Sequence, residues 1–152
     1  MNLQDASNLA INLMKEHGIT YHFQFDNATR RFGYCDLTDR LISLSKPLVE
    51  LNSEERVRNT ILHEIAHALA PRGSGHDWQW KIIATKIGCD ARRTYDKNLV
   101  NSPPPKYKAV CERHNLYIPR RIKKTTLACG RCCKEFNNGK YSNQYLFKWI
   151  TV

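Results

Sequence analysis

Residues 61–71 read ILHEIAHALAP and place one carboxylate and two imidazoles inside an otherwise apolar run. His63 and His67 are four residues apart, so on a helix they lie one turn above the other on the same face. Burial of the Glu64 carboxylate costs several kcal/mol or changes its pKa unless something compensates for the lost water. A cation held by the two histidines would provide that compensation.

The flanking residues predict that this run is helical. Residues 52–55, Asn-Ser-Glu-Glu, read as a helix start, with a capping side chain followed by acids that the helix dipole favours. Pro71 and the glycines at 73 and 75 end the helix. Between them runs an apolar stripe at helical spacing, formed by Val57, Ile61, Leu62, Ile65, Ala66 and Leu69.

The spacing H-E-x-x-H at 63–67 is typical of zinc hydrolases. Two imidazoles bind the ion, zinc lowers the pKa of a bound water to about 7, and Glu64 is placed to act as general base and then general acid. The alternative interpretation is a buried His–Glu cluster joined by hydrogen bonds without a metal.

A catalytic zinc needs a third protein ligand, and His76 in GSGHDW is the best candidate. The glycines before it allow the chain to reverse and bring the imidazole back over the metal. Asp77 and Asp90 are weaker rivals. Tyr21, His22 and Arg72 are candidates for stabilising the oxyanion.

The remaining pattern predicts a small α+β domain. A helix is expected near residues 3–14 and another over 77–87, with strands at 20–25, 31–36 and 41–45. Because the strands follow one another closely, we expect an antiparallel three-stranded meander. Its strand 41–45, as an exposed edge, would hold an extended substrate through backbone hydrogen bonds.

Charge is distributed unevenly along the chain. Residues 1–90 contain ten Lys or Arg against eleven Asp or Glu, whereas residues 91–152 contain fourteen against three. The proline run at 103–105 reads as a stiff spacer. We therefore predict a catalytic domain at 1–90, a linker at 91–106 and a basic module at 107–152.

Four of the six cysteines lie in the last third of the chain, where they pair with one histidine at metal-binding spacing. Cys111-x-x-His114 and Cys129-x-x-Cys132 predict a structural zinc site, with Cys133 as an alternative to Cys132. Disulfides are the alternative use of these cysteines. The predicted cofactors are thus one catalytic and one structural Zn²⁺.

The stretch LISLSKPLVELNSEERVRNTILHEIAHAL followed by GSGHDW resembles the SprT-like zinc metalloprotease family, which includes bacterial SprT proteins and the DNA-dependent protease Spartan. The resemblance implies a zincin-like core followed by a zinc-ribbon-like module. It implies zinc ligands at His63, His67 and His76, and an acid/base at Glu64. The sequence departs from the family pattern at His114, where a cysteine is expected, and either Trp78 or Trp80 fills the family's aromatic place.

The segment between the Cys111–His114 pair and the Cys129–Cys132 pair is strongly basic, which predicts contact with nucleic acid. Arg120, Arg121, Lys123 and Lys124 can follow phosphates, and the neighbouring Tyr117 can stack on a base. The resemblance implies cleavage of DNA-bound or DNA-crosslinked proteins. The alternatives are a zinc-containing nucleic-acid-binding protein without proteolytic activity, and a general zinc peptidase whose tail binds RNA or an acidic protein.

Neither a secretion signal nor a membrane span is visible in the sequence. We expect an intracellular protein, cytoplasmic if bacterial or viral and nuclear if eukaryotic. Its expected partners are protein substrates and DNA, bound without sequence preference. The oligomeric state is left open, and a monomer is compatible with the sequence.

Overall fold

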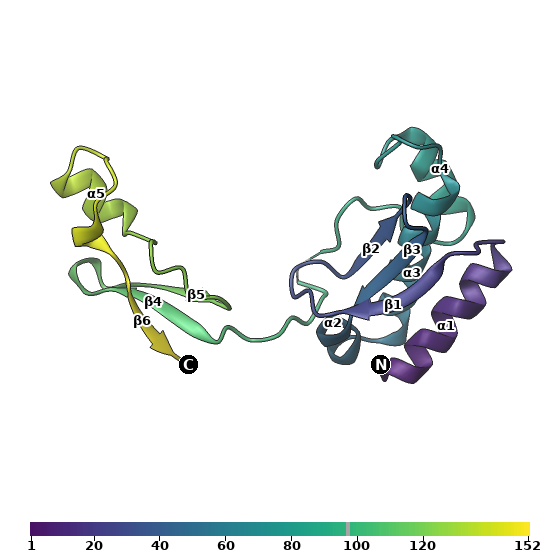
Figure 1. The fold of residues 1–152 in the computed structure, drawn as a ribbon, viewed down its shortest axis with the longest axis horizontal. Helices are drawn as coiled ribbons and strands as arrows, with labels where there is room; N and C mark the ends of the chain where they lie inside the picture. Colours follow the sequence, from purple (N-terminus) through teal and green to yellow (C-terminus); the bar gives the residue numbers. More distant parts are fainter. Residues whose placement is uncertain (97) are drawn as a thin grey trace. The chain divides into compact units, whose positions relative to one another are not determined.

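The chain folds as two units, Met1–Pro103 and Pro104–Val152, in a computed structural model that describes residues 1–96 and 98–152 (Figure 1). Both units combine helices with a three-stranded sheet, so the predicted α+β class is confirmed. None of the helices in these described ranges is long and apolar enough to cross a membrane.

The first unit extends beyond residue 90 and includes most of the segment expected as a linker, 91–106. The ring of Tyr95 packs edge-on against Phe32 at 6.2 Å. The backbone N–H of Asn101 donates to the side chain of Asn52 at 2.9 Å, and the Asn52 amide donates to the Asn101 carbonyl at 2.8 Å. These contacts join residues far apart in sequence, so composition alone placed the boundary too early.

The described residues of the first unit form four helices and three strands. In chain order they are α1 (Leu3–Glu16), β1 (His22–Asp26), β2 (Gly33–Asp36), β3 (Leu41–Ser45), α2 (Lys46–Leu51), α3 (Glu54–Leu69) and α4 (Trp78–Lys86). The helix expected at 77–87 is therefore present as α4, with Asp77 as its N-cap. Pro47 lies in the first turn of the short α2, a position that suits proline because the N–H groups there have no partner within the helix.

The sheet of the first unit is mixed, and the predicted antiparallel meander is wrong. Its order is β1-β3-β2, with β1 parallel and β2 antiparallel to β3. The segment after β1 crosses the end of β3, where the Ser45 hydroxyl donates to the Ala28 carbonyl at 2.5 Å and the Ser45 N–H donates to the Phe32 carbonyl at 2.9 Å. Because β3 is the central strand of this sheet, four of its five residues are buried.

Helix α3 forms the centre of the first core. Ser53 caps it by accepting a hydrogen bond from the Arg56 N–H, and Glu54 and Glu55 occupy the first turn. Its apolar stripe packs against α1, the sheet and α4. The fully buried members are Val57, Ile61, Ile65 and Ala66.

The second unit is a small sheet and a short helix. In chain order its elements are β4 (Tyr107–Cys111), η1 (Glu112–His114), β5 (Leu116–Arg120), α5 (Gly130–Phe136), η2 (Asn143–Tyr145) and β6 (Lys148–Thr151). The sheet is antiparallel in the order β5-β4-β6. Its buried core consists of Ala109, Cys111, Cys129, Cys132 and Phe147, so three of its five members are cysteines. All six cysteines of the chain are free thiols.

Candidate active site and structural metal centre

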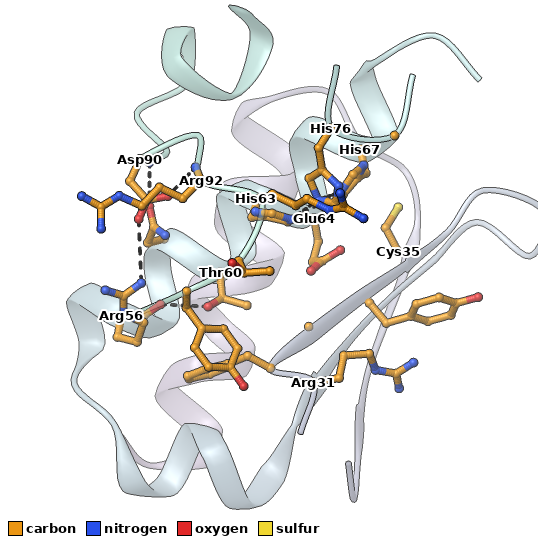
Figure 2. A pocket seen from close by; sticks show the side chains of 18 of the residues that line it. Arg31, Cys35, Arg56, Thr60, His63, Glu64, His67, His76, Asp90 and Arg92 are labelled. Atoms are coloured by element: carbon orange, nitrogen blue, oxygen red, sulfur yellow. Dashed lines mark hydrogen bonds and ion pairs between the residues drawn. The ribbon is translucent and has the colours of Figure 1, made fainter. Parts of the chain in front are cut away.

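Three imidazoles converge at the first candidate site. His63 and His67 lie one turn apart on α3, and His76 returns from the loop that precedes α4 (Figure 2). The Nε2 atom of His76 lies 3.0 Å from that of His63 and 3.1 Å from that of His67, while His63 and His67 are separated by 3.3 Å. The three atoms thus form a nearly equilateral triangle.

This triangle fits a zinc ion. Zn–N bonds of about 2.0–2.1 Å in a tetrahedral site place two ligand nitrogens roughly 3.3 Å apart. Burial lowers the pKa of His63 to about 4, helped by the charges of His67 and His76, and burial likewise lowers that of His67 to about 4. Neutral imidazoles at physiological pH leave a nitrogen lone pair for a metal. The donor set is therefore suited to the ion that family resemblance implies.

Trp80 packs against all three imidazoles. This fully buried side chain of α4 lies with its ring centroid 4.7 Å from His63, 5.3 Å from His67 and 4.7 Å from His76. A rigid aromatic contact restricts the rotamers of the three histidines and so positions them as a group. In the sequence, either Trp78 or Trp80 could fill the aromatic position of the SprT-like pattern. Trp80 is the one buried against the histidines, whereas Trp78 is 68% exposed.

Glu64 is buried beside the histidines (Figure 2), and its carboxylate lies next to Gly33, the first residue of β2. Burial raises its pKa to about 8, while the charge of Arg31 acts in the opposite direction. A divalent cation at the histidines would lower that pKa and keep the carboxylate ionised. An ion bound by the three imidazoles would thus help to offset the cost of burying Glu64.

Gly33 leaves the space that the Glu64 carboxylate occupies. A Cβ atom at position 33 would lie 2.6 Å from Glu64 Oε1 and 2.9 Å from Thr60 Cγ2. Only glycine permits this close approach of β2 to α3. This role of Gly33 was not predicted from the sequence, although a glycine inside the strand pattern RFGYCD indicates a close backbone approach.

We expect a Gly33→Ala substitution to reduce the turnover number about a hundredfold, because the added methyl group must displace the Glu64 side chain by an ångström or more. Zinc content should stay at the wild-type level, since the histidines are not touched. The measurement is kcat on a peptide substrate together with metal analysis. Gly130→Ala is the matched control, because no heavy atom lies within 4 Å of its added Cβ; an unchanged kcat in Gly33→Ala would contradict the expectation.

The site lines a cavity of about 570 Å³ between α3, β2 and the segment after α4. Asp77 caps α4 by accepting hydrogen bonds from the N–H groups of Gln79 and Trp80 and does not join the imidazoles. Asp90 lines the cavity but pairs with Arg56 at 3.9 Å. Neither rival to His76 is therefore placed as a ligand.

The three residues expected to stabilise an oxyanion do not line this cavity. They are Tyr21, His22 and Arg72. The guanidinium of Arg72 instead donates to the Leu37 carbonyl at 3.0 Å.

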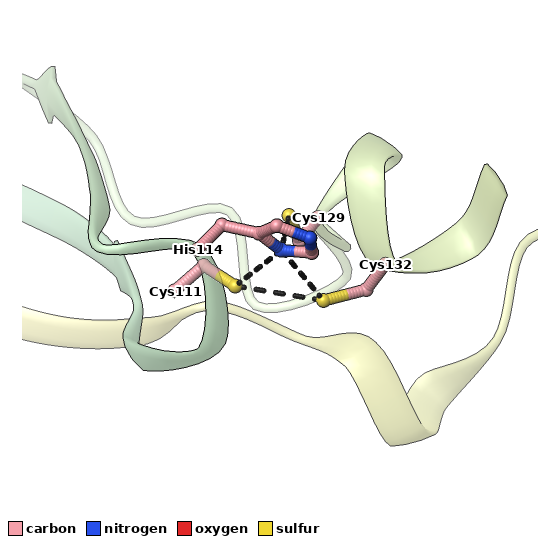
Figure 3. A group of neighbouring side chains, drawn as sticks. All are labelled: Cys111, His114, Cys129 and Cys132. Atoms are coloured by element: carbon pink, nitrogen blue, oxygen red, sulfur yellow. Dashed lines mark hydrogen bonds between the residues drawn. The ribbon is translucent and has the colours of Figure 1, made fainter. Parts of the chain in front are cut away.

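A second group of ligand atoms lies in the other unit. It consists of Cys111 at the end of β4, His114 in η1, Cys129 at the N-cap of α5 and Cys132 in its first turn (Figure 3). Cys111 Sγ lies 3.5 Å from Cys132 Sγ, and His114 Nδ1 lies 3.3–3.8 Å from the three sulfur atoms. All four atoms lie within 4.8 Å of one another, as one tetrahedral zinc requires.

The surroundings of this second group favour a bound metal. His114 turns Nδ1 to the thiols, and its Nε2 donates to the Glu135 carboxylate at 2.8 Å, an arrangement that fixes the ring of a metal-bound histidine. Burial tends to raise the pKa of Cys111, but hydrogen bonds from His114 and the neighbouring thiols bring it down to about 7. Cys133 is buried and outside the group, so Cys132 is the better candidate ligand. No sequence pattern singled out Glu135.

The basic residues expected to contact nucleic acid lie at the end of β5 and in the segment that connects β5 to α5. Arg120 ends β5, and Arg121, Lys123 and Lys124 follow in the connecting segment. Lys123 Nζ lies 4.9 Å from the centroid of the Tyr107 ring. Tyr117, on β5, is 64% exposed.

Comparisons with known proteins add the family. The metallopeptidase zymogen jannalysin from Methanocaldococcus jannaschii is 17% identical, with a TM-score of 0.43 over 62% of this chain and 85% of that one. The comparison with curated proteins found no match. The model of the SprT-like family matches residues 3–102, two thirds of the sequence and nearly all of the first unit. The chain therefore belongs to the SprT-like family.

Proposed function

We propose that this protein is a zinc-dependent endopeptidase of the SprT-like type that cleaves DNA-bound or DNA-crosslinked proteins. The observation that carries the proposal is the triangle of Nε2 atoms from His63, His67 and His76 beside the buried Glu64. Membership of the SprT-like family supports a metalloprotease. The second unit would hold a structural zinc and bind the DNA.

The chemistry follows from what these side chains can do. Zinc, when bound, supplies a Lewis acid that activates water and polarises the scissile carbonyl. The three histidines would hold the ion as neutral ligands, and Trp80 packs against their rings and keeps them in place. The Glu64 carboxylate accepts a proton from the attacking water and then delivers it to the departing amine nitrogen.

The strand that can hold the substrate is β2, and not Leu41–Ser45 as expected from sequence, because that strand is central. Bonding alternates along an antiparallel ladder, and the Phe32 carbonyl already accepts from Ser45. The backbone groups of Gly33 and Cys35 therefore point away from β3. Both residues line the cavity, so an extended peptide could add to this edge with little side-chain selectivity.

We expect Cys35→Pro to lower kcat/KM about tenfold relative to Cys35→Ala, because proline removes one outward-facing N–H donor. The alanine variant controls for loss of the thiol. Zinc content should be equal in the two variants, and KM should account for most of the difference. Equal kcat/KM values would exclude substrate binding along β2.

Charge supports DNA as the partner of the second unit. Residues 104–152 contain eleven Lys or Arg against two acidic residues, whereas residues 1–103 contain thirteen against twelve. Arg120, Arg121, Lys123 and Lys124 provide the densest positive charge, and the exposed Tyr117 offers a ring for stacking on a base. Binding of this kind is independent of sequence and sensitive to salt.

The test is cleavage of a protein crosslinked to a DNA oligonucleotide, compared with the same protein free in solution. The zinc-loaded enzyme should cleave the crosslinked form faster, and about 0.3 M salt should remove the difference. Substitution of Arg120, Arg121, Lys123 and Lys124 by glutamine should also remove the difference in cleavage rate. Arg58→Gln, on the exposed surface of α3, is the control for loss of charge.

Two other results would contradict the proposal, and each would indicate a different function. Equal cleavage with and without DNA would indicate a general zinc peptidase whose tail binds RNA or an acidic protein. DNA binding without any cleavage would indicate a zinc-containing nucleic-acid-binding protein.

A further inference from the structure

Positive charge dominates the lining of the active-site cavity. Five arginines contribute to it, against two acidic residues, Glu64 and Asp90. The arginines are Arg30, Arg31, Arg56, Arg92 and Arg93. This excess is local, because the first unit as a whole is close to neutral.

Two of the five arginines are committed to acidic partners. Arg31 pairs with Asp26 at 2.8 Å, and Arg56 pairs with Asp90 at 3.9 Å. The other three, Arg30, Arg92 and Arg93, are exposed and form no ion pair within residues 1–96 and 98–152. We call these three the arginine rim. Their guanidinium groups are available to a ligand.

The positive charge lies near the reacting groups. Arg93 and Arg31 line the same cavity as His76 and Glu64. Figure 2 shows Arg92 beside Asp90 on one side of the pocket and Arg31 on the other. A peptide residue spans about 3.3 Å when extended, so side chains only a few residues from the scissile bond reach this charge.

We propose that the arginine rim makes the enzyme selective for polypeptide segments that carry Asp or Glu within a few residues of the cleaved bond. The inference rests on the proposed peptidase function and names its substrate class. A guanidinium presents a planar fork of N–H donors that matches a carboxylate, so each matched side chain gains a charge-assisted pair of hydrogen bonds.

The position of the rim favours a peptide carboxylate over a nucleic-acid phosphate. The arginines line the same cavity of about 570 Å³ as the histidines and Glu64. That volume is typical of a site for a few side chains. The stronger excess of positive charge belongs to the second unit, which provides a separate location for DNA.

Selectivity of this kind has a consequence for a protein bound to DNA. The segments that contact phosphates are rich in Lys and Arg, and like charges at the cavity would disfavour their entry. Cleavage should therefore fall in acidic segments away from the DNA surface.

The test uses quenched fluorescent peptides that differ only in whether each position near the centre carries Glu, Gln or Lys. Wild-type enzyme should give kcat/KM about tenfold higher for the best Glu peptide than for its Gln counterpart. An Arg92→Gln, Arg93→Gln double variant should bring the ratio close to one, and the corresponding Glu variant should favour Lys. Arg58→Gln with Lys86→Gln removes the same charge at exposed positions outside the cavity and should retain the wild-type ratio.

Binding separates this inference from the proposed function. Zinc-loaded Glu64→Gln protein should bind the Glu peptide more tightly than the Gln peptide by a similar factor, whether or not the wild type cleaves either of them. Equal affinities, or a preference that survives in the double variant, would overturn the inference. It is also overturned if the double variant loses DNA binding while its peptide preference is unchanged, because the rim would then be a phosphate contact.

Discussion

A Glu64→Gln variant is expected to bind zinc like the wild type and to lose peptide-bond cleavage by roughly a thousandfold. Glutamine has nearly the same shape as glutamate but cannot accept the proton of the attacking water. It also carries no charge, so a buried amide replaces a carboxylate whose pKa burial raises to about 8. The free energy of unfolding of the metal-free protein should therefore rise at neutral pH, because glutamine does not have to bind a proton on folding as the buried carboxyl does.

Single-turnover cleavage and metal analysis measure the two expectations separately. The conservative variant Glu64→Asp keeps the acid but shortens its reach, so its activity should fall between those of the wild type and Glu64→Gln. Undiminished proteolysis by zinc-loaded Glu64→Gln would remove Glu64 from the mechanism and leave the triad of histidines without its base.

Loss of the metal from the second unit should unfold that unit and leave the first unit folded. The five buried residues of its core include three of the four candidate metal ligands, so little apolar surface holds the sheet and α5 together without the ion. Structural zinc in small domains contributes about 10–16 kcal/mol of apparent binding free energy at neutral pH. Cys129→Ser, at a position 1% exposed, should lower the zinc content from two ions per chain to one.

Metal analysis and amide hydrogen exchange of the whole chain test this prediction. Exchange should accelerate throughout residues 104–152 and stay slow in α3. Cys133→Ser is the matched control, because this cysteine is also buried and adjoins Cys132 but lies outside the ligand group. If Cys133→Ser lost the second zinc and Cys129→Ser retained it, the assignment of ligands would be wrong.

The α3 helix could be predicted from sequence almost to the residue, because its cap, apolar stripe and stop are all local signals. Capping by Ser53 and the end of the helix at Leu69 follow from neighbouring residues alone. The strand Leu41–Ser45 was predicted with the same bounds. Its place in the sheet was not, because pairing depends on the Ser45 contacts with a segment some 13–17 residues away.

The supporting residues of the two sites were harder to predict than the ligands. The candidate ligands can be recognised from their spacing in the sequence, as in H-E-x-x-H, C-x-x-H and C-x-x-C. The contacts of Gly33 with Glu64, and of Glu135 with His114, arise only when separate elements pack together. The same holds for the arginine rim, since Arg30 and Arg93 are distant in sequence and meet at one cavity.

The position of Trp80 against the three imidazoles has an optical consequence. Zinc has a filled d shell and is spectroscopically silent, but cobalt and copper enter nitrogen sites of this type and quench the emission of a nearby indole. Trp80 is buried within about 5 Å of the rings of His63, His67 and His76, whereas Trp78 is exposed and Trp149 belongs to the other unit. Emission of Trp80 should thus report occupancy of the three-histidine site independently of turnover.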